Sequence, residues 1–405
     1  MKLAIIGAGA AGVFCAANLK SLEGVSIFES QSLPLRKLML TGGGRCNFTN
    51  LNIDSAEPKN FYPRGAGSLR KPLRAFTAAK AVEFFEGAGV KTKVEDFGRV
   101  FPASGKAASI ANALLKNTAS AIRANSVAER LEPCGDGFQL YLRGADKPEF
   151  FDAVVVAVGG RIGRGLRASL LQMGHTLLPE IPSLYALRID AAGSPNWQPG
   201  LAIPDAEISA DFGGKKISAT GAILTTHFGI TGPAVLKFSS FAAPQLFEKN
   251  FKIGLKINLI YGDFYAKTGV FFQKMRQKEP KKRVKNACPF AIPLAFWQFL
   301  IAECGVNDAL TYANLSKADE AKITLALAEF SCCAEGRAPN KSEFVTCGGV
   351  DCGEVDFATM QSKKAKNLFF LGECLNLDAI TGGFNLHAAW TTAYVCANYL
   401  NKTFF

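Results

Sequence analysis

Residues 2–12 read KLAIIGAGAAG, a short apolar run that leads into a glycine-rich turn. The turn has the pattern Gly-x-Gly-x-x-Gly, in which the first glycine allows a tight turn, the second lets a pyrophosphate approach, and the third permits close packing of helix on strand. We predict a strand over residues 2–7, a helix over residues 12–20 and a second strand in GVSIFES, residues 24–30. This order predicts one βαβ unit of a parallel sheet, with phosphate at the positive end of the helix.

The second predicted strand ends in an acidic residue. Glu29 lies 22 residues after Gly7, where a carboxylate accepts hydrogen bonds from the hydroxyls of an unphosphorylated adenosine ribose. The alternative, a tight turn that binds no ligand, is disfavoured because the motif lies between a strand and a helix. The predicted nucleotide-binding residues of this unit are Gly7, Gly9, Ala10, Ala11, Gly12 and Glu29.

Two later stretches decide between FAD and NAD as the bound nucleotide. FDAVVVAVGG, residues 151–160, resembles the apolar strand ending in Ala-Thr-Gly-Gly of two-dinucleotide-fold flavoproteins, with Val158 in place of threonine. NLFFLGE, residues 367–373, resembles their last strand, and its terminal carboxylate is predicted to bind the ribityl chain. The helix after Gly382-Gly383 would direct its N-terminus at the flavin pyrimidine and stabilise negative charge there. The predicted cofactor is therefore FAD.

The composition is that of an ordinary globular protein, with 48% hydrophobic and 20% charged residues in 405. No apolar run approaches the roughly 18 residues that span a bilayer, so we expect a cytoplasmic protein without a membrane contact. Eleven cysteines without a Cys-x-x-Cys pair, and three histidines, make a metal site improbable. The net charge of +12 is densest in KMRQKEPKKRVK, residues 274–285. Without interleaved aromatic residues, this run is interpreted as a solvated helix end, and a nucleic-acid partner is disfavoured.

The pattern of residues changes near residue 184 and changes back near residue 345. Alternating segments such as KKISATGAILTTH, residues 215–227, predict antiparallel strands in this insertion. Long helices are predicted over residues 75–88 and 106–119. The predicted fold class is α/β: an FAD-binding Rossmann-like domain of the two-dinucleotide type, with an inserted β-barrel-like subdomain and a helical subdomain. The predicted parts are residues 1–183 and 345–405 for the FAD-binding domain, 184–262 for the barrel-like subdomain, 263–330 for the helical subdomain and 331–344 for a return strand.

Four separated stretches resemble the signatures of the HI0933-like flavoprotein family, also called the BaiN/YhiN family of NAD(P)/FAD-dependent oxidoreductases. They are KLMLTGGGRCNFTN (37–50), THFGITGPAVL (226–236), VTCGGVDCGEVDFATMQSK (345–363) and GECLNLDAITGGFNLHAAW (372–390). The resemblance covers nearly the whole chain. It implies an FAD domain with the two inserted subdomains, and members have been assigned to reduction of conjugated steroid enones or labelled aminoacetone oxidases.

By this resemblance the loop at residues 37–50 lies along the FAD, close to the isoalloxazine ring. Three consecutive glycines suit it to that place, because they let backbone N–H groups approach a ligand. Lys37 would lie near the adenosine and phosphate end, and Arg45 would place positive charge near the flavin anion that develops on reduction. The further cofactor-binding residues that the resemblance implies are Lys37, Thr41, Gly42, Gly43, Gly44, Arg45, Cys46, Asn47, Val127, Ala157, Gly159, Gly160, Gly372, Glu373, Gly382, Gly383, Phe384, Asn385 and Leu386.

Cys46 and the histidines leave alternatives open. Cys46 has no resolving partner close in sequence, so a packed flavin neighbour is preferred over a redox-active thiol. Arg45 and His227 are the candidate catalytic residues. His227 is the candidate proton donor, since histidine titrates near neutral pH, although a structural role in its turn is the alternative. His387 stands where the family usually has glutamine, so it either replaces that hydrogen bond or simply packs.

One segment departs from the family pattern. After Gly160 the chain continues with RIGRGLRASLLQMGH, residues 161–175, which is shorter than the family's loop at this point. Within it GRGLRA mimics a Gly-x-Gly-x-x-Ala motif, and the arginines are candidates to bind a phosphate of NAD(P)H. A shortened loop explains the same residues without a phosphate site, and we prefer that interpretation.

The predicted function is an FAD-dependent oxidoreductase in which NAD(P)H gives a hydride to flavin N5 and the flavin passes it to an electron-poor acceptor such as an enone. NAD(P)H is expected to bind transiently without a Rossmann domain of its own, because no second βαβ unit with its own turn and acidic residue is found. One alternative is an amine oxidase that uses dioxygen. The other is a flavin-bearing protein of nucleic-acid binding or tRNA modification, which the positive charge would suit.

Overall fold

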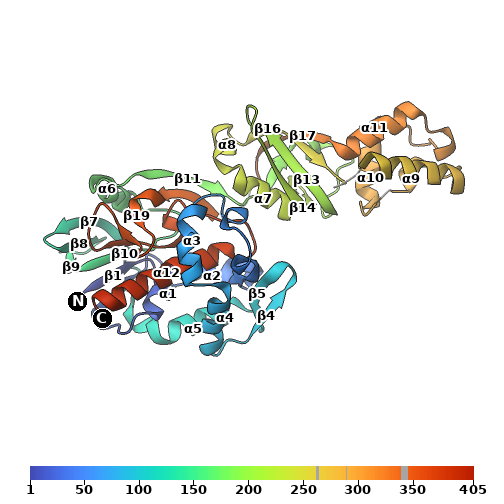
Figure 1. Ribbon diagram of the computed structural model, residues 1–405. Coiled ribbons are helices and arrows are strands. Elements are labelled where there is room, and N and C mark those ends of the chain that lie inside the picture. The colour runs from blue at the N-terminus through green and yellow to red at the C-terminus, as the bar shows by residue number, and fades with distance from the viewer. Residues whose placement is uncertain (261–263, 289, 339–344) are drawn as a thin grey trace. The chain divides into compact units, whose positions relative to one another are not determined.

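The computed structural model describes residues 1–260, 264–288, 290–338 and 345–405. The chain forms two compact units, Met1–Ile181 with Val345–Phe405, and Pro182–Phe344 (Figure 1). The predicted domain boundaries stay predictions, and two of them, after residue 262 and at the end of the 331–344 segment, lie outside the described residues. Among the described residues, no helix combines the length and the apolar character that crossing a membrane requires.

The first unit is built on a seven-stranded sheet in the order β19-β20-β21-β10-β1-β2-β6. Strands β1 (Leu3–Ile6), β2 (Val25–Phe28), β6 (Ile122–Arg123), β10 (Ala153–Val156) and β21 (Leu368–Phe370) run parallel, and β19 (Val355–Asp356) and β20 (Gln361–Ser362) are antiparallel at one edge. Ile6 lies beside both Phe28 and Val156 in register. All residues of β1 and β10 are buried, as expected for central strands of a parallel sheet.

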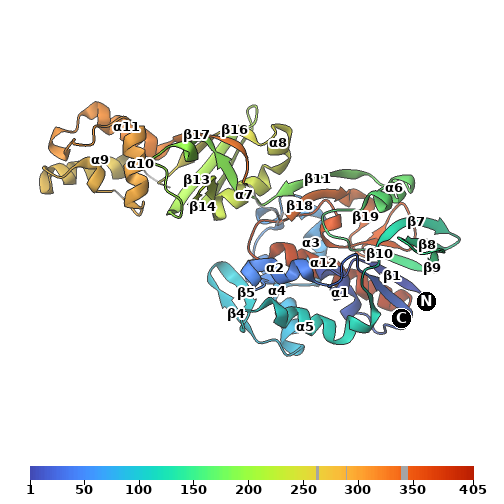
Figure 2. The same cartoon turned by 180° about the vertical axis from the view of Figure 1, so that it is seen from behind.

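Helix α1 (Ala10–Ala17) leaves β1 directly and packs against α12 (Phe384–Thr403) and α5 (Ala107–Thr118) (Figure 2). The antiparallel sheet of β7 (Ala128–Cys134), β8 (Gly137–Leu142) and β9 (Glu149–Phe151) contacts β10. Other elements of this unit are α2 (Arg36–Leu40), β3 (Thr49–Asn50), β4 (Thr92–Glu95), β5 (Arg99–Pro102), α6 (Arg164–Gln172) and β18 (Val345–Val350). Strand β11 (Leu177–Ser183) begins in this unit and ends beyond its boundary at Ile181.

The helix predicted over residues 75–88 is wrong in its start. The structure has two helices here, α3 (Ala66–Ala75) and α4 (Ala78–Gly87). Thr77 separates them, because its side chain accepts a hydrogen bond from the Lys80 N–H at 3.2 Å and caps α4. A threonine in an extended conformation at an N-cap ends the preceding helix and begins the next one.

The second unit contains a closed six-stranded barrel in the order β12-β15-β14-β13-β16-β17. Its strands are β12 (Leu187–Ile189), β13 (Ala202–Asp211), β14 (Lys216–Thr226), β15 (Gly229–Thr231), β16 (Lys252–Asn258) and β17 (Phe330–Arg337). Helices α7 (Pro233–Phe241) and α8 (Ala243–Glu248) precede β16, and α9 (Phe264–Lys278), α10 (Leu294–Glu303) and α11 (Lys317–Ala328) lie between β16 and β17. The predicted fold class, a Rossmann-type FAD domain with an inserted barrel and helices, is confirmed.

Candidate functional site

The glycine turn between β1 and α1 contains two glycines that the fold needs and one that it does not. Gly7 has a φ of +110°, and a Cβ there would lie 2.8 Å from the Ala157 carbonyl carbon. A Cβ on Gly12 would overlap the Gly7 carbonyl and lie 3.2 Å from Ile5 Cγ2. A Cβ on Gly9 would meet no atom within 4 Å. Gly9 therefore leaves open space at the N-terminus of α1, which is the cradle that a pyrophosphate requires.

Glu29 lies beside this turn, at the end of β2. Its Oε2 accepts from the Ala8 N–H at 3.0 Å, and its Oε1 accepts from the Gln31 N–H at 2.8 Å. The Glu29 carbonyl accepts from the Ser126 N–H at 2.7 Å, which brings Val127 to the same end of the sheet. A carboxylate oxygen accepts more than one hydrogen bond, so both oxygens retain capacity for ribose hydroxyls. The structure thus brings the predicted adenosine-binding residues together.

The loop after α2 exposes its backbone, as expected from its glycines. Gly42, Gly43 and Gly44 have φ values of +58°, +68° and +83°, a region that favours glycine. All three are exposed, and a Cβ on Gly43 would meet no atom within 4 Å. Thr41 is held inward by its hydroxyl, which donates to the Leu38 carbonyl at 2.7 Å. The loop therefore presents exposed backbone without side chains, which a ligand can approach closely.

The same loop meets the N-terminus of α12. A Cβ on Gly383, the N-cap of this helix, would lie 2.8 Å from Asn47 Oδ1 and 2.6 Å from the Thr49 carbonyl oxygen. Asn47 Oδ1 is buried and has no hydrogen-bond partner among the described residues. The first N–H groups of a helix have no partner within it, so those of Phe384, Asn385 and Leu386 face this region. An unsatisfied acceptor beside unsatisfied donors fits the polar edge of a flavin pyrimidine.

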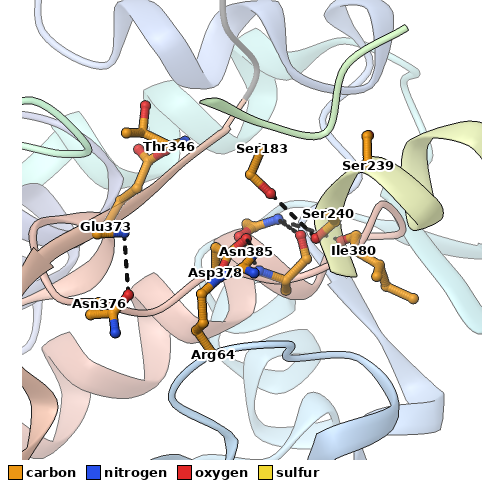
Figure 3. A network of polar contacts seen from close by, with 12 residues as sticks. Arg64, Ser183, Ser239, Ser240, Thr346, Glu373, Asn376, Asp378, Ile380 and Asn385 are labelled. Carbon is orange, nitrogen blue, oxygen red and sulfur yellow. Dashed lines mark hydrogen bonds and ion pairs between the residues drawn. The ribbon is translucent and has the colours of Figure 1, made fainter. Parts of the chain in front are cut away.

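Asn385 and a buried ion pair fix the turn before α12. The Asn385 amide accepts from the Ala379 N–H at 2.9 Å and donates to the Ala379 carbonyl at 2.8 Å. Figure 3 shows it next to Asp378, whose fully buried carboxylate pairs with Arg64 through two hydrogen bonds. Phe384 is held by Tyr62, whose hydroxyl donates to its carbonyl at 3.0 Å. Contacts within the protein therefore hold the turn at the predicted pyrimidine end.

Glu373, predicted to bind the ribityl chain, already has protein partners. Its Oε2 accepts from Lys37 Nζ at 3.0 Å and from the Gly160 N–H at 3.2 Å. Its Oε1 accepts from the N–H of Thr346, which lies beside Glu373 in Figure 3, at 2.8 Å. Lys37 was assigned to the adenosine and phosphate end, so the structure joins two residues that the sequence placed along different parts of the cofactor. Their roles toward FAD stay predictions.

Arg45 lies in a small charged cluster on the β4–β5 hairpin. Its guanidinium pairs with Glu95 and lies 4.2 Å from the centroid of the Phe101 ring. Lys93 Nζ is 2.9 Å from Glu95 Oε1, and hydrogen bonds from Lys93 and Arg45 lower the pKa of the Glu95 carboxyl. Glu95 is thus ionised and offsets one of the two cations. The positive charge predicted at this loop is present, but it is shared.

Cys46 is fully buried behind the exposed glycines. Its φ is +59°, and its N–H donates to the Thr41 carbonyl at 3.0 Å. Burial raises the pKa of the Cys46 thiol to about 12, and no described cysteine is in a disulfide. Because the thiolate is the reactive form, these observations favour the packed neighbour over the redox-active thiol.

The two histidines of interest, His387 and His227, lie in different units of the chain. His387 is buried in α12, with Nδ1 2.9 Å from Thr49 Oγ1 and Nε2 3.1 Å from the Phe76 carbonyl oxygen. Burial lowers the pKa of His387 to about 4, so it is a neutral hydrogen-bonding residue. His227 is exposed at the turn between β14 and β15 in the second unit, without a hydrogen bond or ion pair to its ring among the described residues. Its catalytic role stays a prediction.

The GRGLRA segment begins helix α6. A Cβ on Gly165 would lie 3.1 Å from the Glu129 carbonyl carbon, so this glycine permits close packing of α6 on β7. Arg167 pairs with Glu180 at 3.1 Å and also donates to the Leu177 carbonyl. These contacts within the protein favour the shortened loop over a second phosphate site.

Sequence reasoning missed Asn50 and the turn that it holds. Asn50 Nδ2 donates to the Gly382 carbonyl at 2.9 Å and to the Phe97 carbonyl at 3.2 Å. It therefore connects the β4–β5 turn with the loop before α12. The only signal in the sequence is the position of Asn50 at the end of the quoted 37–50 stretch, and that does not indicate its partners.

The chain is similar to several known proteins. A family model described as HI0933-like protein Rossmann domain matches residues 1–399. The chain is 29% identical to the ribosomal RNA dihydrouridine synthase of Escherichia coli, over 98% of this chain and 97% of that protein. It is 28% identical to the 3-dehydro-bile acid delta(4,6)-reductase of Clostridium scindens, over 97% of each chain. A 3-ketosteroid delta1-dehydrogenase structure from Sterolibacterium denitrificans aligns with a TM-score of 0.47 at 12% identity, over 99% of each chain.

Proposed function

The chain belongs to the HI0933-like family, a family of FAD-binding oxidoreductases, and from this premise we propose that it reduces a carbon–carbon double bond conjugated with a carbonyl group, using NAD(P)H as the electron donor. One observation carries the proposal. Two relatives that each match almost the whole chain have names with different substrates but one chemistry.

That shared chemistry is hydride addition to a polarised double bond. A dihydrouridine is a uridine whose C5=C6 bond, conjugated with the C4 carbonyl, carries two added hydrogens. A delta(4,6)-reductase of a 3-oxo steroid acts on double bonds conjugated with the 3-carbonyl. In both cases hydride adds to the carbon remote from the carbonyl and negative charge develops on the carbonyl oxygen. The enzyme then needs an electron carrier, a proton source and an anion-stabilising environment.

Different residues of the chain would hold the electron carrier, stabilise the negative charge and supply the proton. Gly9 and the N-terminus of α1 would hold the pyrophosphate, and Glu29 the adenosine ribose. When bound, FAD supplies the two-electron carrier between NAD(P)H and the acceptor. The N-terminus of α12 and Arg45 favour negative charge at the polar edge of the ring. His227 is our proposed proton donor, because its exposed imidazole makes no hydrogen bond or ion pair with the described residues.

A basic surface favours RNA as the substrate class. In the segment 274–285, Lys274, Lys278, Lys281 and Arg283 are exposed and make no ion pair with the described residues. The other cations of the segment are paired, Arg276 with Glu320, Lys282 with Glu279 and Lys285 with Asp308. Uncompensated lysines and arginines give affinity for a phosphate backbone. From the sequence alone we interpreted this segment as a solvated helix end. A small enone is the second substrate class.

Anaerobic reduction of the purified protein tests the proposal. NADH or NADPH should bleach the flavin absorbance, and an acceptor should restore it. The acceptors are an unmodified ribosomal RNA transcript, androst-4-ene-3,17-dione and dioxygen. In a separate arm aminoacetone replaces NAD(P)H as the electron donor, and dioxygen is the acceptor. Restoration by the RNA or the steroid, with a product heavier by two hydrogens, supports the proposal. Turnover only with aminoacetone would instead assign an amine oxidase.

A pair of charge reversals tests the substrate class. Lys278→Glu with Lys281→Glu should weaken RNA binding and lower the slope of log affinity against log salt by about 1 to 2. Lys215→Glu with Lys216→Glu, at the exposed β13–β14 turn, is the matched control. Equal losses in both variants would point to general attraction by net charge. Turnover of the steroid should be unchanged in both.

A further inference from the structure

We propose that Phe97 is a substrate-positioning residue, whose ring stacks on the planar conjugated ring that the enzyme reduces. The inference rests on the proposed function and goes beyond it by naming a recognition residue. Phe97 belongs to the turn Asp96–Gly98 between β4 and β5. Neither the family signatures nor the cofactor-binding residues discussed above include it.

The first observation is that the fold gains little from this side chain. Phe97 is 83% exposed, the highest value among the exposed large hydrophobic residues of the described chain. Its φ is +61°, in the left-handed region that a bulky residue rarely occupies. Glycine or asparagine would meet the demands of such a turn without strain. A strained, exposed aromatic residue calls for a purpose other than packing.

The second observation is that the turn is held in a fixed place. The Phe97 carbonyl accepts from Asn50 Nδ2 at 3.2 Å and from Asn52 Nδ2 at 3.0 Å. A Cβ on Gly98 would lie 2.9 Å from Asn50 Oδ1, so Gly98 allows the turn to approach this amide. The backbone of the turn is therefore fixed while the ring projects into solvent.

The third observation is the place to which the turn is tied. The same Asn50 Nδ2 donates to the Gly382 carbonyl at 2.9 Å, directly before the N-cap of α12. One amide group thus joins the carbonyl of Phe97 to the loop at the predicted pyrimidine end of the flavin. Phe97 is in this way connected to the loop that we predict to lie beside the flavin ring.

The chemistry of the acceptor explains the aromatic side chain. Both substrate classes contain a flat, conjugated carbonyl ring, and such a ring stacks on an aromatic face. Stacking of a base on an aromatic residue contributes about tenfold to a hundredfold in affinity, with little dependence on the identity of the base. Phe97 then orients the ring, while the chemistry remains with other groups.

Four variants test the inference in the FAD-loaded enzyme. Phe97→Leu should raise the KM and the equilibrium Kd for the acceptor by about tenfold or more, leaving FAD content and the rate of flavin reduction by NAD(P)H unchanged. Phe97→Tyr keeps the aromatic ring and should have the KM and the Kd of the wild type. Phe97→Gly should keep or raise the Tm, since it removes strain, yet lose acceptor affinity. Phe150→Leu is the matched control, because Phe150 is another exposed phenylalanine, at 43%, and lies on β9.

The probes are the ribosomal RNA transcript and androst-4-ene-3,17-dione, with binding followed by the change in flavin absorbance of the oxidised enzyme. Wild-type turnover with unchanged constants in Phe97→Leu would overturn the inference and leave the proposed function standing. If the wild type reduces neither probe, the proposed function fails, and binding alone decides the inference. It stands if Phe97→Leu weakens that binding and Phe150→Leu does not. It falls if the two variants behave alike or the wild type binds neither probe.

Discussion

Gly9 allows the cofactor site to be tested separately from the fold. An alanine Cβ at this position would meet no protein atom within 4 Å, and φ −82° with ψ −172° is accessible to any L residue. The substitution Gly9→Ala loses a favourable N-cap glycine but also lowers the entropy of the unfolded chain. These effects oppose each other, so the free energy of unfolding of the flavin-free protein should change by less than about 1 kcal/mol.

The same methyl group should damage FAD binding severely. It occupies the open space before α1, where the pyrophosphate must approach the free N–H groups. We expect a loss of about a hundredfold in affinity, which corresponds to about 2.7 kcal/mol. At one FAD concentration well above the Kd of both proteins, stabilisation by the cofactor should shrink by the same 2.7 kcal/mol or so.

Urea unfolding with and without FAD, together with FAD titration, measures both quantities. The matched control is Gly163→Ala, because Gly163 is the N-cap of α6 and a Cβ there also meets no atom within 4 Å. That variant should retain both stability and FAD affinity. Gly12→Ala should instead destabilise the flavin-free protein, by about 1–3 kcal/mol or more, because its Cβ overlaps the Gly7 carbonyl. FAD affinity of Gly9→Ala within threefold of the wild type would refute the assigned cradle.

Three further predictions concern the flavin loop and α12. Cys46→Ser should keep NAD(P)H-dependent flavin reduction within about tenfold, since burial keeps the thiol protonated, and a hundredfold loss with FAD still bound would assign it a chemical role. Arg45→Met should lower the flavin reduction potential by about 20 mV, the equivalent of roughly 1 kcal/mol for a partly exposed charge. Glu95→Gln should raise this potential. Equal shifts in one direction would contradict the shared-charge cluster. Burial lowers the pKa of His387 to about 4. Between pH 6.5 and pH 4, therefore, the unfolded state binds a proton at this histidine that the folded state excludes. The free energy of unfolding should fall by about 2 kcal/mol from pH 7.5 to pH 5. His387→Gln should remove that part of the acid sensitivity in urea titrations, and an unchanged pH profile would count against a neutral buried His387.

Local patterns were sufficient for the nucleotide-binding unit. The run Leu3–Ile6, the Gly7–Gly12 turn and Glu29 fall within one βαβ unit, so their separation along the chain also determines their separation in space. The six-stranded barrel could be expected for a related reason, because alternation of apolar and polar residues marks antiparallel strands. The start predicted for the helix over residues 75–88 was wrong, because one threonine side chain outcompeted helix propensity at its cap.

Tertiary structure alone decided how the site is held and charged. Asn50 meets Gly382 across 332 residues, Lys37 meets Glu373 across 336, and Arg64 meets Asp378 across 314. No sequence pattern indicates such partners, because each pair depends on how separate elements pack against the common sheet. The protonation of Cys46 and His387 depends on packing in the same way. Removal of water by neighbouring side chains shifts both pKa values, and desolvation is a property of the folded surroundings and not of the residue.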